Sequence, residues 1–342
     1  MDAPRPGRRA RAGPLGVSGL GGLTAAICTR NRPDLLARAL ESLITQTPAV
    51  AEILVVDNAP ADDATRSLVA ARFPSVRYVA EPVPGLDFAR NRALEAATRE
   101  VVAFLDDDAV AAPGWADSLH GVFEADADVA VCTGRIEPLS LETPGQRLFE
   151  ANGGFSRGTE RIRLPDDARR LLHGRRAPLI AWAISVGCGC NYAVRRSTAR
   201  ALGGFDEALD LGSPLPGGGD HDLLWRALSA GHAVVYEPSA LAWHEHRRDL
   251  EAVHDQIAGH QRAVLAFLAK HLMGSDSRSR PALLGYTGWR LAKPGFRLLR
   301  RAVRRDPLPA RLLVRMWWNC WLGLLVYPRA RRLARRRREA VR

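Results

Sequence analysis

An apolar run that ends in three consecutive carboxylates constrains the fold more than any other part of this chain. Val101–Leu105 reads as a buried β-strand, and Asp106-Asp107-Asp108 follow it directly. A second strand-like run, Ile53–Val56, likewise ends in an acid, Asp57. Acids at one edge of a sheet repel one another unless a cation joins them, and a divalent metal is the usual solution. Because ligands of open α/β sheets bind outside the carboxyl ends of the strands, we predict a nucleotide and metal site here.

Strand-like and helix-like patterns alternate from Leu23 onward. Apolar residues at helical spacing follow short apolar runs, which indicates β-α units. The expected strands are Leu23–Thr29, Glu52–Asp57, Val76–Ala80, Val101–Asp106, Val129–Thr133, Tyr192–Val194 and Ala233–Tyr236. The expected helices are Asp34–Ile44, Ala61–Arg72, Leu86–Thr98, Pro113–Ala125 and Asp220–Ala230. This rhythm predicts an α/β fold with a mostly parallel sheet that helices flank on both faces.

The net charge of +12 is concentrated at the two ends of the chain. Residues 278–342 contain nineteen Arg and Lys against two acids, and the first residues are rich in Pro, Gly and Arg, so the body between is mildly acidic. We expect residues 1–20 to form a disordered basic arm, residues 21–250 the globular domain and residues 251–342 a helical, Arg-rich extension.

Five scattered cysteines, none in a C-x-x-C pair, indicate free thiols in a reducing compartment. Glycines interrupt the mildly apolar stretch near the N-terminus, which therefore does not read as a secretion signal. We expect a cytoplasmic protein.

The segment Leu312–Tyr327 is apolar, contains three tryptophans and is flanked by basic runs. It is shorter than the roughly 20 residues that span a bilayer. Tryptophan beside arginine suits a helix lying in a membrane interface, which would place the protein at the inner face of the cell membrane. The alternative is a helix that packs its tryptophans on the domain, and the sequence leaves both open.

Further short motifs accompany the acids. Cys28–Arg32 follows the first strand, Gly85–Asn91 opens a helix, Gly217–Asp222 precedes another, and Trp243-His244-Glu245-His246 follows the last strand. Together with Val-Val-Asp-Asn, Phe-Leu-Asp-Asp-Asp and the Gly203–Asp206 turn, they make the region from Leu23 to Arg247 resemble the family 2 glycosyltransferases, which have the GT-A fold. In that family the donor is a nucleotide-diphosphate sugar, and Mn²⁺ or Mg²⁺ bridges its phosphates.

The resemblance implies a role for each matching residue. Asp220 matches the general base, and Asp108 and His244 match the metal ligands. His246 competes with His244, and we expect its ring to point the other way. The donor nucleotide would lie near Thr29, Arg32, Asp57, Arg90 and Asp106. The acceptor side would include Gly189, Asn191 and Asp222, although Asp222 alternatively caps its helix or holds an arginine.

Sugar transfer needs charge neutralisation on the leaving diphosphate, a base for the acceptor hydroxyl, and in-line positioning. One base without a second, nucleophilic carboxylate favours direct displacement and inversion at the anomeric carbon. One departure from the family concerns the acceptor: a glutamate commonly precedes the base, and here that position is Gly219.

Other functions fit parts of the sequence. The Arg-rich tail could bind a polyanion, but the acidic body shows no nucleic-acid motif, and anionic lipid accounts for the tail equally well. A metal-dependent hydrolase needs more His and Asp ligands than can be placed. A sugar nucleotidyltransferase carries a Gly-rich phosphate loop after its first strand. In this chain Thr29–Arg32 occupies that position, which argues against this function. The acceptor stays open among glycans, lipid-linked precursors, proteins and small molecules.

Overall fold

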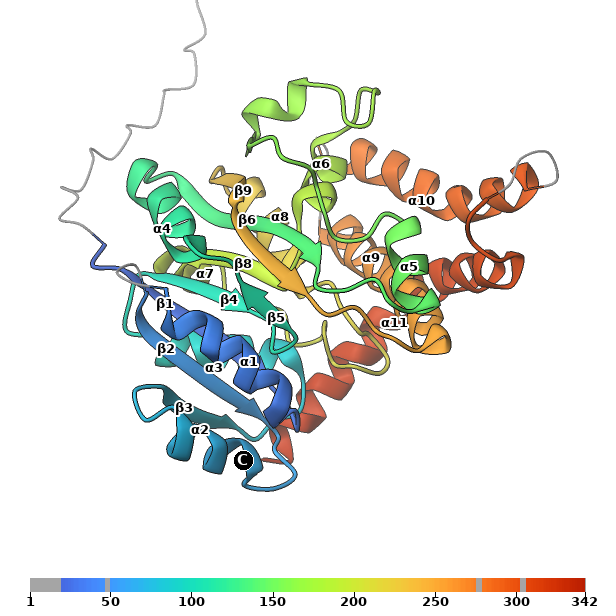
Figure 1. Cartoon of the computed structure of the whole chain (residues 1–342). Helices are drawn as coiled ribbons and strands as arrows, with labels where there is room; N and C mark the ends of the chain where they lie inside the picture. The colour runs from blue at the N-terminus through green and yellow to red at the C-terminus, as the bar shows by residue number, and fades with distance from the viewer. Residues whose placement is uncertain (1–19, 47–49, 275–278, 302–305, 342) are drawn as a thin grey trace, which may run out of the picture.

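The computed structural model describes residues 20–46, 50–274, 279–301 and 306–341. The expected basic arm, residues 1–20, therefore lies almost wholly outside the described residues. A nine-stranded mixed sheet forms the centre of the molecule, in the order β3-β2-β1-β4-β8-β6-β9-β5, with β7 paired to β9 (Figure 1). The strands are β1 (Leu23–Thr29), β2 (Val50–Asn58), β3 (Arg77–Glu81), β4 (Val101–Leu105), β5 (Ala109–Ala111), β6 (Val129–Pro138), β7 (Ile162–Leu164), β8 (Asn191–Arg195) and β9 (Ala233–His244).

Helices cover both faces of the sheet and continue beyond it. They are α1 (Pro33–Ile44), α2 (Ala64–Arg72), α3 (Leu86–Ala96), α4 (Trp115–Ala125), α5 (Pro144–Ala151), α6 (Leu179–Val186), α7 (Arg196–Ala201), α8 (Gly219–Ser229), α9 (Leu250–Gly274), α10 (Arg280–Arg300) and α11 (Ala310–Glu339), with a 3₁₀ turn at Asp166–Arg169. The predicted α/β class is confirmed, and each predicted strand and helix overlaps an observed one, although β6 and β9 continue well beyond their predicted ends.

Successive side chains of the strands point to opposite faces of the sheet and form an apolar layer on each face. Helices cover both layers for this reason. Leu36 and Leu40 of α1 pack with Ile27 on one face of the sheet. Ala93 of α3 and Leu224 of α8 pack against the opposite face. Each layer thus removes one side of the sheet from water, and the sheet edge remains for ligands.

The strands β3, β2, β1 and β4 run parallel, which brings their carboxyl ends to one edge. Thr29 of β1 lies in register with Asp57 of β2, and β4 runs alongside β1 on its other side. Beyond β4 the sheet changes character because β8 enters antiparallel to both β4 and β6. The sequence pattern did not predict this reversal.

One predicted strand end was wrong and one strand was not predicted, and both differences matter for the site. The strand predicted to end at Tyr236 continues as β9 to His244, and the unpredicted strand β5 begins at Ala109. These two strands pair antiparallel, with Ala109 opposite His244. His244 is therefore held in the sheet and does not lie in a loop after it.

The C-terminal helices pack on the sheet domain along one face and expose the other. Leu265 and Phe267 of α9 and Cys320 of α11 belong to the same apolar cluster as the sheet. In Figure 1, α11 (red) crosses the molecule, and its end lies near the start of α3, where the Arg337 guanidinium donates to the Pro84 carbonyl over 2.7 Å. Within the described parts of the chain, none of the helices is both long enough and apolar enough to cross a bilayer.

Candidate active site

A cavity of about 970 Å³ opens at the carboxyl ends of the central strands. Its walls come from the segment after β4, the end of β9, the start of α8, and helices α9 and α11. Seven residues predicted from the sequence line it: Arg32, Arg90, Asp106, Asp108, Gly189, Asp220 and His244. Thr29, Asp57, Asn191 and Asp222 are not part of its lining.

Backbone pairing brings Asp108 and His244 together. The amide of Glu245 donates to the Asp108 carbonyl over 2.9 Å, which extends the β5–β9 ladder by one residue. As a result, Nε2 of His244 lies 3.2 Å from Oδ1 of Asp108. Ladder geometry fixes this approach more firmly than loop contacts would.

The ring of His246 does not point away from His244, and that expectation was wrong. Residues two apart on an extended segment share a face. The two Nδ1 atoms lie 3.1 Å apart, and both rings line the cavity. Nε2 of His246 is engaged by Oε1 of Glu150 at 2.7 Å, whereas Nε2 of His244 faces Asp108.

The residues around His244 form a set that fits a divalent cation. Ligand atoms of Asp106, Cys190 and His244 all lie within 4.8 Å of one another. Oδ1 of Asp108 is buried beside this group and faces Nε2 of His244. Burial and the neighbouring charge of Asp108 raise the pKa of Asp106 to about 8. Two carboxylates and an imidazole suit Mn²⁺ or Mg²⁺, and a cation would relieve this repulsion.

Asp107 faces a different direction from its two neighbours. Its carboxylate accepts a 2.7 Å hydrogen bond from the Thr29 hydroxyl and a 3.1 Å bond from Arg32. Thr29 is thus buried behind the acidic cluster, while Arg32 remains half exposed in the cavity wall and also lies 3.5 Å from Asp108. Thr29 is placed to hold the cluster, and Arg32 is placed to meet a ligand.

Asp57 lies at the end of β2, at the same edge but outside the cavity lining. The Tyr78 hydroxyl donates to its Oδ2 over 2.9 Å, and Oδ1 is buried without a hydrogen-bond partner. Burial raises the pKa of Asp57 above its ordinary value. An unsatisfied carboxylate oxygen at a strand end remains compatible with a polar ligand group.

Arg90 reaches into the cavity from α3 and is held by buried acids. Its guanidinium donates to Asp87 over 3.0 Å and lies 3.6 Å from Asp210. Gly189 is required beside it, since a Cβ there would lie 2.7 Å from Arg90 and 3.2 Å from Asp220. The absent side chain lets the arginine and the predicted base approach each other.

Asp220 begins α8 and is nearly buried in the cavity wall. Its Oδ1 lies 2.9 Å from Nδ1 of His221. Burial alone would raise the pKa of Asp220, but the charge and hydrogen bond of His221 hold that pKa below its ordinary value. The carboxylate is therefore ionised at neutral pH and can accept a proton from a bound hydroxyl.

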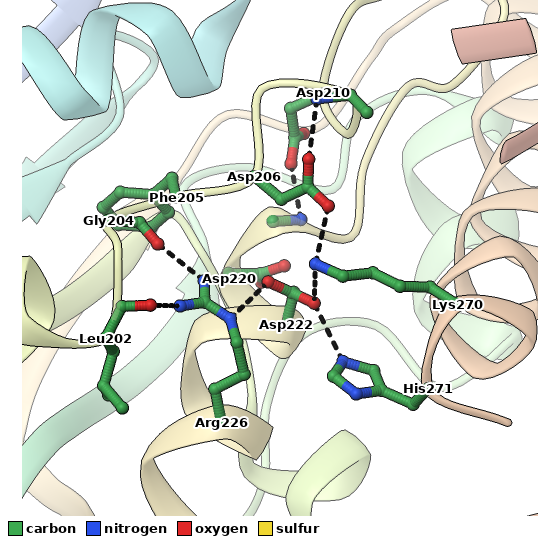
Figure 2. Close-up of polar contacts among 12 residues, drawn as sticks. Leu202, Gly204, Phe205, Asp206, Asp210, Asp220, Asp222, Arg226, Lys270 and His271 are labelled. Carbon is green, nitrogen blue, oxygen red and sulfur yellow. Dashed lines mark hydrogen bonds and ion pairs between the residues drawn. The ribbon is translucent and has the colours of Figure 1, made fainter. Parts of the chain in front are cut away.

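Asp222 does not face the acceptor side but occupies a closed network (Figure 2). Its side chain is fully buried and accepts from Arg226 (2.8 Å), Lys270 (2.6 Å) and His271 (2.8 Å). Lys270 also contacts Asp206 at 2.6 Å, which ties the Asp206 turn and helix α9 to the start of α8. The alternative interpretation of the sequence, in which Asp222 binds an arginine, agrees with its contact to Arg226.

Asn191 is likewise a structural residue. Its side chain is fully buried, accepts from the Trp115 indole over 2.8 Å, and donates to two main-chain carbonyls. No polar atom of the Asn191 amide remains for an acceptor. The Gly-rich stretch therefore contributes Gly189 to the cavity but not Asn191.

The missing glutamate before the base has a steric explanation that the sequence did not reveal. A Cβ at position 219 would lie 1.9 Å from Oδ2 of Asp87. That oxygen is buried and has no hydrogen-bond partner among the described residues. Asp87 lies within the Gly85–Asn91 motif, but nothing in the motif indicated that its carboxylate fills the space beside Gly219.

Comparisons with known proteins bear on the family and the fold. The sequence matches the family described as glycosyl transferase family 2 over residues 24–203, which is slightly more than half of the chain. The match ends before Asp220 and His244. Pre-mycofactocin glycosyltransferase of Mycobacterium tuberculosis is 32% identical over 230 residues, 67% of this chain and 43% of that protein. The succinoglycan biosynthesis protein ExoM of Rhizobium meliloti is 29% identical over 71% of this chain and 69% of ExoM.

The chain thus spans less than half the length of the mycobacterial relative. Among solved structures, mannosyltransferase PcManGT from Pyrobaculum calidifontis, in complex with GDP-Man and Mn²⁺, superimposes with a TM-score of 0.56. That match covers 92% of this chain and 87% of PcManGT at 19% sequence identity, and GalNAc-T7 gives a TM-score of 0.51. These likenesses show a shared fold, and the predicted GT-A architecture is confirmed.

Proposed function

Because the chain belongs to glycosyl transferase family 2, we propose that it transfers a sugar from a nucleotide-diphosphate donor to an acceptor hydroxyl, with inversion at the anomeric carbon. The observation that carries this proposal is the convergence of Asp106, Asp108, Asp220 and His244 on one cavity. The PcManGT complex with GDP-Man and Mn²⁺ supports the donor class and the cation.

Asp106, Asp108 and His244 would hold Mn²⁺ or Mg²⁺. When bound, the cation supplies Lewis-acid neutralisation of the diphosphate leaving group. The raised pKa of Asp106 supports this assignment, because a positive charge at that position would relieve its repulsion with Asp108. Arg32, half exposed at the cavity wall, is positioned to pair with donor phosphate.

Asp220 acts as the general base in this proposal. Its Oδ1 is bound to His221, while Oδ2 lies on the side of Gly189. An acceptor hydroxyl above Gly189 would donate its proton to Asp220 as its oxygen attacks the anomeric carbon. Arg90, fixed by Asp87 and Asp210, stays in place beside that carboxylate and stabilises its ionised form.

Among the described residues, the acids closest to Asp220 are held by other groups. Arg226, Lys270 and His271 bind Asp222, Arg90 pairs with Asp87, and Asp210 accepts from the Gly219 amide over 2.8 Å. A single free base supports direct displacement. The product anomer should therefore have the opposite configuration to the donor, which NMR of the isolated product would establish.

The membrane surface is a proposed partner as well. The tryptophans predicted in Leu312–Tyr327 lie on α11, where Trp317, Trp318 and Trp321 expose between 43% and 65% of their surface. Aromatic side chains beside arginines favour the interface of an anionic bilayer. We propose that this face of α11 contacts such a bilayer at the inner side of the cell membrane, while Leu312 and Cys320 pack inward. The relation to ExoM supports an acceptor in glycan or envelope polysaccharide synthesis.

The decisive experiment is a donor screen in the presence of Mn²⁺. Sugar transfer and donor binding would be measured separately for the wild type, Asp220→Asn and Asp108→Ala. Asp220→Asn should bind donor normally and lose turnover, whereas Asp108→Ala should lose Mn²⁺-dependent donor binding. The matched control is Asp117→Asn on the exposed surface of α4, which should change neither. Normal transfer by Asp220→Asn would refute the assignment of the base.

A further inference from the structure

A second cavity lies on the surface of α10 and has a strongly basic lining. Its volume is about 700 Å³, and it shares no lining residue with the active-site cavity. Basic side chains dominate it, including Arg175, Lys293, Arg297 and Arg300, against one acid, Asp306.

The one acid in the cavity lining, Asp306, is already paired with an arginine. The Arg297 guanidinium makes two hydrogen bonds to the Asp306 carboxylate, at 2.6 and 2.8 Å. Among the described residues, no acid pairs with Arg175, Lys293 or Arg300. Three cations thus face the cavity without an anionic partner, and this arrangement is complementary to a phosphate group.

Aromatic residues alternate with these cations along one face of α10. Trp289, Lys293, Phe296 and Arg300 recur at helical spacing. Lys293 lies 4.9 Å from the centre of the Trp289 ring, and Arg300 lies 5.8 Å from that of Phe296. Because the rings are exposed yet held beside the cations, an anion bound here would also meet apolar surface.

The apolar surface around the cavity continues toward α11. Phe296 is 59% exposed and Leu299 is 75% exposed. Gly295 of α10 approaches the ring of Trp317, since a Cβ at Gly295 would lie 3.7 Å from that indole. Helix α10 therefore lies beside Trp317 of α11 at a position next to the cavity-lining residue Phe296.

We infer that this cavity binds the phosphate headgroup of an anionic membrane lipid, with Lys293 and Arg300 pairing to the phosphate and Phe296 entering the interface. The inference rests on the membrane contact proposed above and assigns that contact a specific site. A soluble phosphate would satisfy the cations but leave the aromatic rim unused. The combination of free cations and exposed rings favours a lipid.

The test is co-sedimentation of the full chain with vesicles of phosphatidylcholine alone and of phosphatidylcholine mixed with phosphatidic acid. Wild type should bind the mixed vesicles and not the neutral ones. The double variant Lys293→Gln/Arg300→Gln should lose roughly 30-fold in vesicle partitioning, because each cation at a membrane surface contributes about a fivefold factor. Phe296→Ser should weaken partitioning without a change of charge.

The matched control is Arg332→Gln/Arg335→Gln, which removes the same charge from exposed positions of α11 outside the cavity. An equal loss in both double variants would mean general attraction to the basic tail and would overturn the cavity assignment while leaving membrane contact intact. No binding of wild type to anionic vesicles would refute the membrane contact itself. Full displacement by inorganic phosphate, with Phe296→Ser unchanged, would also overturn the lipid assignment. Sugar transfer to a soluble acceptor should be unaltered in all variants, so failure of the catalytic proposal is measured separately.

Discussion

The acids that follow β4 and the acid Asp222 in α8 are both largely sheltered from water, yet their surroundings are opposite. In the first group, burial and the charge of Asp108 raise the pKa of Asp106 to about 8, and His244 lies 3.2 Å from the buried Oδ1 of Asp108. Asp222 is bound by Arg226, Lys270 and His271, and these contacts lower its pKa despite burial. The first group retains a repulsion between two acids that a cation would relieve. The second is complete, so it serves the scaffold.

The largest effect should come from the acid that faces the cavity on the same helix as Asp222. Asp220→Asn should reduce turnover by about a thousandfold, the usual scale for a lost general base. Its unfolding temperature should fall less than that of Asp222→Ala, since the isosteric amide retains a contact with His221 and loses only the charge that His221 and Arg90 favour. Steady-state kinetics with saturating donor measure the first effect and calorimetry the second.

Asp222→Ala should show the reverse pattern. Removing this carboxylate leaves Arg226, Lys270 and His271 without their shared partner, and breaking a buried ion network costs about 3 kcal/mol of unfolding free energy. Urea denaturation measures that loss. If Asp222→Ala were as stable as wild type and merely inactive, the assignment of this acid to the scaffold would be wrong.

A steric prediction links the two motifs that meet at α8. Gly219→Ala should cost about 2 kcal/mol because its Cβ would overlap the Asp87 carboxylate. Asp87→Gly in the same chain should recover more than about 1 kcal/mol of that cost, a coupling expected only for residues in contact. A double-mutant cycle in urea measures it, and strictly additive losses would contradict the packing described.

The contrast also predicts opposite responses to pH in the metal-free protein. The pKa of Asp106 is raised to about 8, so the folded state holds a proton that the unfolded chain releases, and this contribution to stability declines as pH rises toward 8. The pKa of Asp222 is lowered, so its contribution is present above the ordinary carboxyl pKa and is lost as pH falls below it. Thermal melts across pH measure both contributions. Asp106→Asn should reduce the loss of stability as pH rises toward 8, and Asp222→Ala should reduce the loss of stability in acid.

The smallest effect should be at Asp108. The contacts of Asp108 with His244 and Arg32 lower its pKa despite burial, so Asp108→Ala should lose about 1 kcal/mol of unfolding free energy in the metal-free protein. Melting the variant with and without Mn²⁺ checks this, and wild type alone should be stabilised by the ion. An Asp108→Ala variant that Mn²⁺ stabilises as much as wild type would contradict the role of Asp108 as a metal ligand.

Much of the fold could be predicted from local patterns. Apolar runs and helical spacing located the β-α units around β1 to β4, because each unit buries its own apolar face. The reversal at β8 could not be predicted in this way, since a short apolar run carries no sign of its direction. The extension of β9 to His244 was missed because its second half alternates irregularly around Pro238 and Ser239.

In the candidate site too, sequence motifs indicated some residues, whereas others are recognised only from tertiary packing. Motifs indicated Asp108, Asp220 and His244, and the structure places all three around one cavity. The enclosure of Asp222 depends on Lys270 and His271, which lie about fifty residues later in the chain and belong to no motif. Asp87 filling the space beside Gly219 is a contact between two motifs, and only tertiary packing reveals it.

The most direct test of the central claim is a titration of the protein with Mn²⁺ followed by electron paramagnetic resonance, in which bound ion loses the signal of free ion. Wild type and Asp117→Asn should bind one ion alike, and Asp108→Ala should bind at least about tenfold more weakly. Equal Mn²⁺ affinity in wild type and Asp108→Ala would contradict the claim that the acids after β4 and His244 form a cation site.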